Sequence, residues 1–92
     1  MKSFKEDLNV AVFTTRFVIR EGEPILYVFH HEEDGAWEFI SATQAVCDSD
    51  YLIVALAQII DRDAAILELA DLQQGEAAYR SDITGVWQRR KI

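Results

Sequence analysis

The chain has 92 residues, of which 50% are hydrophobic and 11% are aromatic, which excludes an intrinsically disordered class and allows one globular core. No apolar stretch approaches the ~20 residues of a membrane-spanning helix, and the first residues lack the apolar region of a signal peptide. The single cysteine, Cys47, has no partner for an internal disulfide. We therefore expect a cytoplasmic protein with one domain over residues 1–92, in which residues 1–8 form a loose leader.

The charge of the chain is acidic and unevenly distributed. The net charge is −7, from 16 acidic and 9 basic residues, and from Glu21 to Glu76 thirteen acidic residues stand against one base, Arg62. An acidic middle repels phosphate groups, so nucleic acid is not an expected partner. Such a surface either keeps the protein in solution or binds a basic protein.

The first predicted strand covers residues 9–20, where side chains alternate over a long stretch. Residues 21–23 would then turn the chain, because Gly22 is free to take a positive φ, and Pro24 would begin the next strand. Since the opposite set carries two arginines, the expected core face is Ala11, Phe13, Thr15, Phe17 and Ile19.

Residues 25–31 and 37–40 are predicted to form a hairpin, because Asp-Gly between two apolar runs is a strong turn signal. A tip at Asp34 and Gly35 places His30 opposite Phe39. With residues 9–20, this hairpin predicts an antiparallel meander of three strands. Alternation of side chains puts one group on a common side of the hairpin: Leu26, Val28, His30, Trp37 and Phe39.

Residues 51–60 fit either a strand or a helix, since Tyr51 and Ile53 favour a strand whereas Leu56 and Ile59 recur at helical spacing. We interpret residues 52–60 as a helix with Ser49 or Asp50 as its N-cap. Asp63 is expected to cap a second short helix over residues 64–72, whose apolar face is Ile66, Leu69 and Leu72.

The C-terminal stretch predicts a second hairpin, in which residues 77–81 and 86–91 flank a turn containing Asp82 and Gly85. Tyr79 and Trp87 are its expected anchors, because each combines a large apolar area with a polar tip. The whole pattern predicts an α+β fold with a mostly antiparallel sheet. That sheet combines the N-terminal three-strand meander with the C-terminal hairpin, and one or two short helices lie between them.

Few residues point to catalysis or metal binding. His30 and His31 are adjacent, so on a regular strand they face opposite sides and cannot share a metal ion. Cys47 is followed by Asp48 and Asp50, whose negative charges disfavour a thiolate. We therefore expect no catalytic residue, no metal and no cofactor.

The acidic residues around the first hairpin are the candidate partner-binding site. The run at residues 32–35 lacks the alternating ligands of a calcium loop, so it predicts a solvated hairpin tip. An acidic tip on a sheet can bind a basic protein surface, and its candidate contact residues are Glu32, Glu33, Asp34 and Glu38.

Five stretches stand out by their order and spacing: TTRFV at 14–18, PILYV at 24–28, DGAWEF at 34–39, ILELADL at 66–72 and WQR at 87–89. Together they resemble a family of small bacterial domains of unknown function that is related to predicted immunity proteins of bacterial toxin systems. The resemblance covers most of the chain from about residue 10 onward. It implies a bacterial cytosolic protein with a binding role at most, and it supplies no catalytic residues.

Three functions remain open from the sequence. The leading hypothesis is a non-enzymatic protein-binding domain that is immunity-protein-like and uses its acidic surface. The second is a homodimeric scaffold formed through the two-sided apolar hairpin. The third is a small-ligand-binding protein or an enzyme, which would need a pocket near His30 and Cys47.

Overall fold

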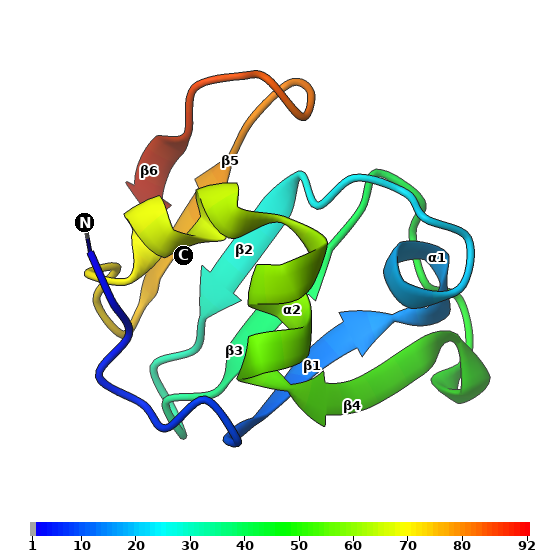
Figure 1. Cartoon of the computed structure of the whole chain (residues 1–92), viewed down its shortest axis with the longest axis horizontal. Helices are drawn as coiled ribbons and strands as arrows, with labels where there is room; N and C mark the ends of the chain where they lie inside the picture. Colours follow the sequence, from blue (N-terminus) through cyan, green and yellow to red (C-terminus); the bar gives the residue numbers. More distant parts are fainter. Residues whose placement is uncertain (1) are drawn as a thin grey trace.

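The computed structural model describes residues 2–92, in which a six-stranded sheet has the strand order β4-β1-β3-β2-β5-β6 (Figure 1). The pairing of β1 with β3 is parallel and the other pairings are antiparallel. The predicted α+β class and mostly antiparallel sheet are confirmed. In chain order the elements are β1 (Ala11–Thr15), α1 (Arg16–Ile19), β2 (Tyr27–His30), β3 (Trp37–Ile40), η1 (Asp48–Asp50), β4 (Tyr51–Ala55), α2 (Leu56–Arg62), η2 (Ala64–Leu69), β5 (Glu76–Tyr79) and β6 (Gln88–Lys91).

The predicted three-strand meander is wrong, because β1 does not pair with β2. Phe13 of β1 lies beside Glu38 of β3, and β4 pairs with the other edge of β1. The chain leaves the sheet after Thr15, where α1 buries both Phe17 and Val18. Two consecutive residues of a strand point to opposite faces, so a helical turn is the way to bury both of them on one side. The continuous strand predicted over residues 9–20 therefore ends at Thr15.

The predicted core face of β1 is also wrong. Val12 and Thr14 point into the core, whereas Phe13 is 39% exposed. The buried hydroxyl of Thr14 donates a 2.6 Å hydrogen bond to the carbonyl of Phe39, which offsets the cost of its burial. The prediction placed the face with the arginines toward solvent. Arg16 belongs to α1 and not to β1, so its charge says nothing about which face of β1 is buried.

The first hairpin forms as predicted, but its register differs by two residues. His30 lies opposite Trp37, and Val28 lies opposite Phe39. The loop closes through hydrogen bonds from His31 N–H to the Ala36 carbonyl and from the N–H of Gly35, whose φ is +72°, to the His31 carbonyl. A shift by two preserves the faces of a strand, so the four inward residues of the hairpin are buried as a group.

The helix predicted over residues 52–60 is wrong in its first half. Tyr51–Ala55 is strand β4, paired along its whole length with β1, and α2 begins at Leu56. The β-branched residues Ile53 and Val54 suit the strand, and the helical spacing that the sequence shows starts only with Leu56 and Ile59.

The cap of the second short helix is as predicted. The side chain of Asp63 accepts a hydrogen bond of 3.0 Å from Ala65 N–H at the start of η2. Ile66, Leu69 and Leu72 follow, and all three are buried. Polar groups at the cap and apolar groups on one face together explain why this segment folds against the sheet.

Both α2 and η2 lie in front of the sheet in Figure 1, and together they cover one of its faces. Between the helices and the sheet lies the core, which Phe4, Val10, Ile19, Val54, Ile60 and Trp87 extend at its margins. Within residues 2–92 no helix has the length and apolar character to cross a membrane. The buried core cluster consists of Val12, Val18, Ile25, Val28, Trp37, Phe39, Leu56, Ile59, Ile66, Leu69, Leu72 and Ala78.

The second hairpin is confirmed, with Tyr79 opposite Gln88. Directly after β5 comes Arg80, whose side chain is 1% exposed. Its guanidinium donates hydrogen bonds to the carbonyls of Ile25 (3.0 Å) and Ile83 (3.1 Å) and forms an ion pair with Asp63. It also lies 4.3 Å from the ring centre of Trp87. One buried cation thus joins the second hairpin, the cap of η2 and the start of the first hairpin.

We predict that Arg80→Met lowers the free energy of unfolding by about 3 kcal/mol, because it removes one partner of a buried ion pair and leaves the carboxylate of Asp63 without its cation. Urea unfolding followed by circular dichroism measures this loss. Arg20→Met is the control, since Arg20 is exposed. Equal stability of both variants would contradict a structural role for Arg80.

Candidate functional site

The face of the sheet opposite the helices, here called the open face, exposes aromatic and aliphatic side chains. Phe13, Tyr27, Tyr51 and Tyr79 are between 38% and 46% exposed, and Ile53 is 65% exposed. The pairing register places these side chains in two rows that run across the strands. One row is Ile53, Phe13, Glu38, Phe29, Ala77 and Arg90, and the other is Tyr51, Thr15, Ile40, Tyr27, Tyr79 and Gln88.

Two adjoining hollows form a groove on the open face. The larger, of about 550 Å³, lies over Tyr27 and Ile40 and is walled by residues 41–45. The smaller, of about 390 Å³, lies between Phe13 and the loop of the first hairpin. The two hollows share three lining residues, His31, Glu38 and Tyr51. Their size and largely apolar lining with a few polar groups are typical of a binding surface.

His31 and Glu38 form a pair where the two hollows meet. The Nε2–H of His31 donates a 2.8 Å hydrogen bond to Oε1 of Glu38, and the side chains are 34% and 19% exposed. The imidazole also stacks against Phe29, with 6.0 Å between the ring centres. Because this contact holds one carboxylate oxygen of Glu38, the pair supplies a fixed polar point in an otherwise apolar floor.

Three of the four predicted partner-binding residues line the groove. Glu33, Asp34 and Glu38 all belong to the smaller hollow. Glu32 does not line it, since its carboxylate lies against Gly75, 3.3 Å from where a Cβ of that residue would stand. The structure therefore separates Glu32 from the other three acidic side chains, although it is their neighbour in sequence.

The acidic loop is held against residues 73–75. Gly75 N–H donates a 2.7 Å hydrogen bond to the carbonyl of His30, and the carboxylate of Asp34 accepts one of 2.9 Å from Ala36 N–H. Gln74 Nε2 lies 2.9 Å from where a Cβ of Gly35 would stand, and it is the positive φ of this residue that favours glycine here. We call this contact between the two loops the loop clasp.

The wall of the larger hollow is fixed by a buried carboxylate. Asp50 accepts hydrogen bonds from Val46 N–H (2.9 Å), from Cys47 N–H (3.3 Å) and from Arg16 Nε (2.9 Å). The bond from Val46, then the one from Arg16, lowers the pKa of Asp50 from 3.8 to about 2. Within the wall the hydroxyl of Thr43 donates a 2.7 Å hydrogen bond to Glu23 and lowers the pKa of that carboxyl.

Two parts of the groove were missed by reasoning from the sequence. The sequence suggests for the basic tail at residues 89–91 no more than an offset to the acidic middle of the chain. In the structure Arg90 lines the larger hollow, and its guanidinium carbon lies 5.3 Å from the ring centre of Tyr79. Most of the wall at residues 41–45 belongs to the stretch 42–49, for which the sequence predicts only irregular structure or a brief helical turn. The alternating aromatics of β2, Tyr27 and Phe29, were the available signal, because their outward face is too apolar for ordinary solvated surface.

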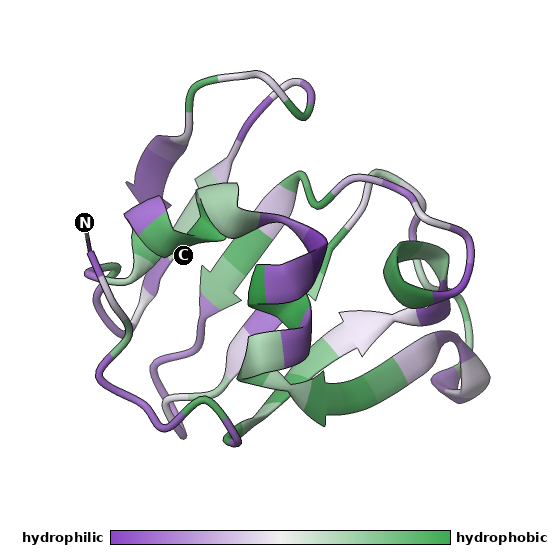
Figure 2. Cartoon of the chain, in the orientation of Figure 1, coloured by the Kyte–Doolittle hydropathy of each residue, from purple (hydrophilic) through white to green (hydrophobic). Residues whose placement is uncertain are grey.

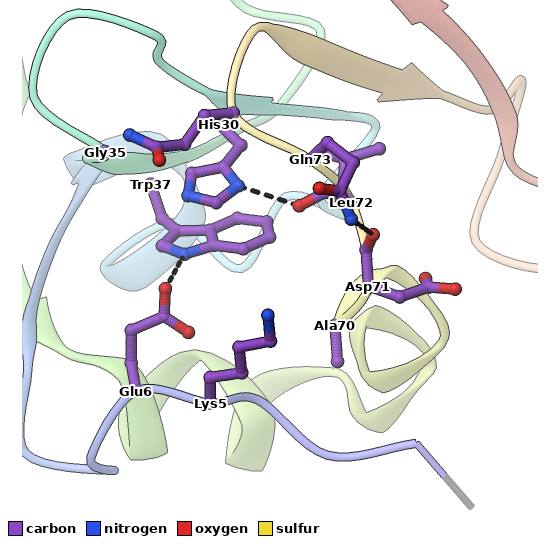
Figure 3. Close-up of a pocket in the computed structure, with 10 residues that line it drawn as sticks. Lys5, Glu6, His30, Gly35, Trp37, Ala70, Asp71, Leu72 and Gln73 are labelled. Carbon is purple, nitrogen blue, oxygen red and sulfur yellow. Dashed lines mark hydrogen bonds between the residues drawn. The ribbon is translucent and has the colours of Figure 1, made fainter.

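His30 and Trp37 line a separate pocket of about 250 Å³ on the helix side of the sheet (Figure 3). The imidazole stacks on the indole with 3.9 Å between ring centres, and its Nδ1–H donates to the carbonyl of Leu72 (2.8 Å). The indole N–H donates to Glu6 (2.8 Å). Phe4 packs edge-on against the indole. These contacts fasten residues 4–6, from the stretch expected to be a loose leader, to the end of the sheet.

Cys47 lies apart from this pocket. It is exposed, with its Sγ 3.1 Å from the hydroxyl of Ser49. None of the four best-formed cavities within residues 2–92 is lined by both His30 and Cys47. The same part of the chain contains no cluster of three or more side chains suited to a metal ion. The groove on the open face is therefore the candidate functional site.

Comparisons with known proteins assign no family. No family model, curated protein or solved structure matches the chain significantly. The groove must therefore be interpreted from its own residues.

We predict that Asp50 contributes stability above about pH 4 and that this contribution disappears as the pH falls toward 2. The sign follows because the folded state, with its pKa near 2, binds the proton less readily than the unfolded chain, whose Asp pKa is near 3.8. Denaturant unfolding of the wild type and of Asp50→Asn, repeated from pH 7 to pH 2, checks this. The stability difference between them should be constant above pH 4 and shrink below it.

Asp48→Asn is the control for this series, because Asp48 is exposed and belongs to the same short helix. The difference in free energy of unfolding between Asp48→Asn and the wild type should change less with pH than the corresponding difference for Asp50→Asn. A difference that is the same at pH 2 and pH 7 for Asp50→Asn would refute the assignment.

Proposed function

We propose that the chain is a non-enzymatic protein-binding domain that binds a basic partner through the groove on its open face. The observation that carries the proposal is the meeting of Glu33, Asp34 and Glu38 with exposed aromatic side chains along one hollow. Aromatic side chains at the centre and charges at the rim are the usual composition of a protein interface.

Each part of the groove has a separate role in this proposal. Phe13 and Tyr51 offer apolar area that a partner side chain covers, which contributes most of the affinity. Glu33 and Asp34 lie at the rim, where opposite charge speeds association and selects the partner. Because rim charges are screened by salt, binding should weaken as ionic strength rises.

Binding has more support than catalysis or a small-ligand site. The imidazole of His31 is already bonded to Glu38, and that of His30 to the carbonyl of Leu72. Cys47, the remaining candidate nucleophile, does not line the pocket that contains His30, and it does not line the larger hollow of the groove. A pocket joining His30 and Cys47, which the enzyme hypothesis needs, is thus missing from the described cavities.

The resemblance to domains related to immunity proteins supports a bacterial toxin as the partner of this groove. An immunity-protein-like function needs a surface that is complementary to one other protein and needs no reactive group. The exposed single thiol of Cys47 is compatible with a reducing cytoplasm as the place of binding.

A defined probe tests the groove before a partner is identified. We expect a short Lys-Trp-Lys-Lys peptide to shift the amide resonances of Phe13, Glu38 and Tyr51 in the labelled protein, and a Glu-Trp-Glu-Glu peptide to leave them unchanged. The double variant Glu33→Gln/Asp34→Asn should bind the basic peptide about five- to tenfold more weakly at low salt, since it loses two rim charges.

The matched control is Glu32→Gln/Asp61→Asn, which changes the net charge by the same amount but alters two residues outside the groove. It should bind the basic peptide nearly as well as the wild type. The proposal fails if both double variants lose affinity equally, or if the basic peptide shifts resonances elsewhere than in the groove.

A further inference from the structure

The two edge strands of the sheet differ sharply in charge. β6 reads Gln-Arg-Arg-Lys, and all of its residues are exposed. β4 reads Tyr-Leu-Ile-Val-Ala and carries no charged side chain. Figure 2 shows the contrast, since β4 is hydrophobic over most of its length and β6 is hydrophilic. Edge strands present unpaired backbone groups, and charged side chains such as Lys protect them from pairing with another chain.

Backbone hydrogen bonding shows which groups of β4 point outward. Leu56 N–H donates to the carbonyl of Val10, so alternation along an antiparallel pair turns the groups of Leu52 and Val54 toward β1. The groups of Tyr51, Ile53 and Ala55 therefore face away from the sheet.

Two of these outward groups already have partners. Tyr51 N–H donates to the carbonyl of Asp48 at the end of η1. Ala55 is the N-cap of α2, and its carbonyl accepts the first bond of that helix. The outward backbone groups of β4 that remain for pairing are the N–H and carbonyl of Ile53, the carbonyl of Tyr51 and the N–H of Ala55.

We propose that two copies of this chain pair antiparallel through β4, with Ile53 on the two-fold axis. In this register each Ile53 exchanges both backbone bonds with its counterpart, and each Ala55 N–H donates to the Tyr51 carbonyl of the other copy. Every free outward group of β4 then has a partner. The sheet becomes continuous across the dimer, and the two open faces lie on the same side.

A second copy fits this edge better than other pairings of the same sheet edges. Pairing β4 of one copy with β6 of another would leave one β6 edge and one β4 edge free at the ends. Further copies could then add without limit, and the assembly would not close. Pairing β6 with β6 would bring Arg89, Arg90 and Lys91 against like charges. Pairing β4 with β4 closes at two copies, and the edges that remain outside are the charged β6 strands.

A contact of this length belongs to the small interfaces, so dimers should appear at protein concentrations of about 0.1–1 mM. Sedimentation equilibrium from about 10 μM to about 1 mM measures the dissociation constant. Each protomer carries a net charge of −7, so added salt should strengthen the dimer, whereas it should weaken binding of a basic partner at the groove.

Ile53→Lys is the decisive variant, because it places two ammonium groups beside each other on the axis; we expect the dissociation constant to rise at least about tenfold. Ile53 is 65% exposed, so the protomer should stay folded. Ile83→Lys is the matched control, since Ile83 is 56% exposed in the turn before β6, away from β4, and it should leave the dimer intact.

Amide hydrogen exchange on the unmodified protein gives a second readout. The N–H of Ile53 should exchange more slowly at 1 mM than at 10 μM, and this is specific to backbone pairing at β4. A monomer over the whole concentration range overturns the proposal. So does a dimer that Ile83→Lys weakens as much as Ile53→Lys, or one in which the Ile53 amide stays unprotected.

Discussion

The covering of the sheet on one face by α2 and η2 determines most of this structure. Both helices follow β4 in the chain, and their buried residues, such as Leu56 and Ile66, pack on the same side as Phe39. Burying each such side chain contributes about 1.5–3 kcal/mol, so this face holds the domain together. Neither α2 nor η2 lies over the opposite face. The aromatic side chains there consequently meet solvent, and the groove exists because the core is one-sided.

Local features of the fold could be predicted from the sequence, because the residues that cause them are close together. The hairpin around Gly35, the cap at Asp63 and the apolar face of η2 each depend on a few neighbouring residues. The position of β1 could not be predicted in this way. Its parallel pairing with β3 depends on packing between distant segments, and α1 begins where the alternation of the sequence still favours a strand. Arg80 was missed for the same reason, since its partners Ile25 and Asp63 are far from it in the chain.

In the candidate site too, the features set by neighbouring residues could be predicted from the sequence, and those set by distant segments could not. Glu33, Asp34 and Glu38 could be proposed from the sequence, because they flank a hairpin that the sequence predicts well. Glu32 could not be separated from them, since its direction depends on the approach of residues 73–75. Arg90 reaches the groove because the edge strand β6 pairs with β5, which pairs with β2, whose Tyr27 lines the same hollow. In the sequence Arg90 only offsets acidic charge, but the order of the strands makes it a lining residue of the groove.

The loop clasp also restricts the acidic side chains of the first hairpin. Gln74 lies beside Gly35, and the N–H of Gly75 donates a hydrogen bond to the carbonyl of His30, so the two loops are packed against each other. This packing limits the conformations of the acidic loop in the free protein, and a loop that is already restricted loses less conformational entropy when it is ordered further. Gln74 lies outside the groove, but a substitution there would still change the positions of the hairpin's carboxylates, because Gln74 supports the loop that carries them.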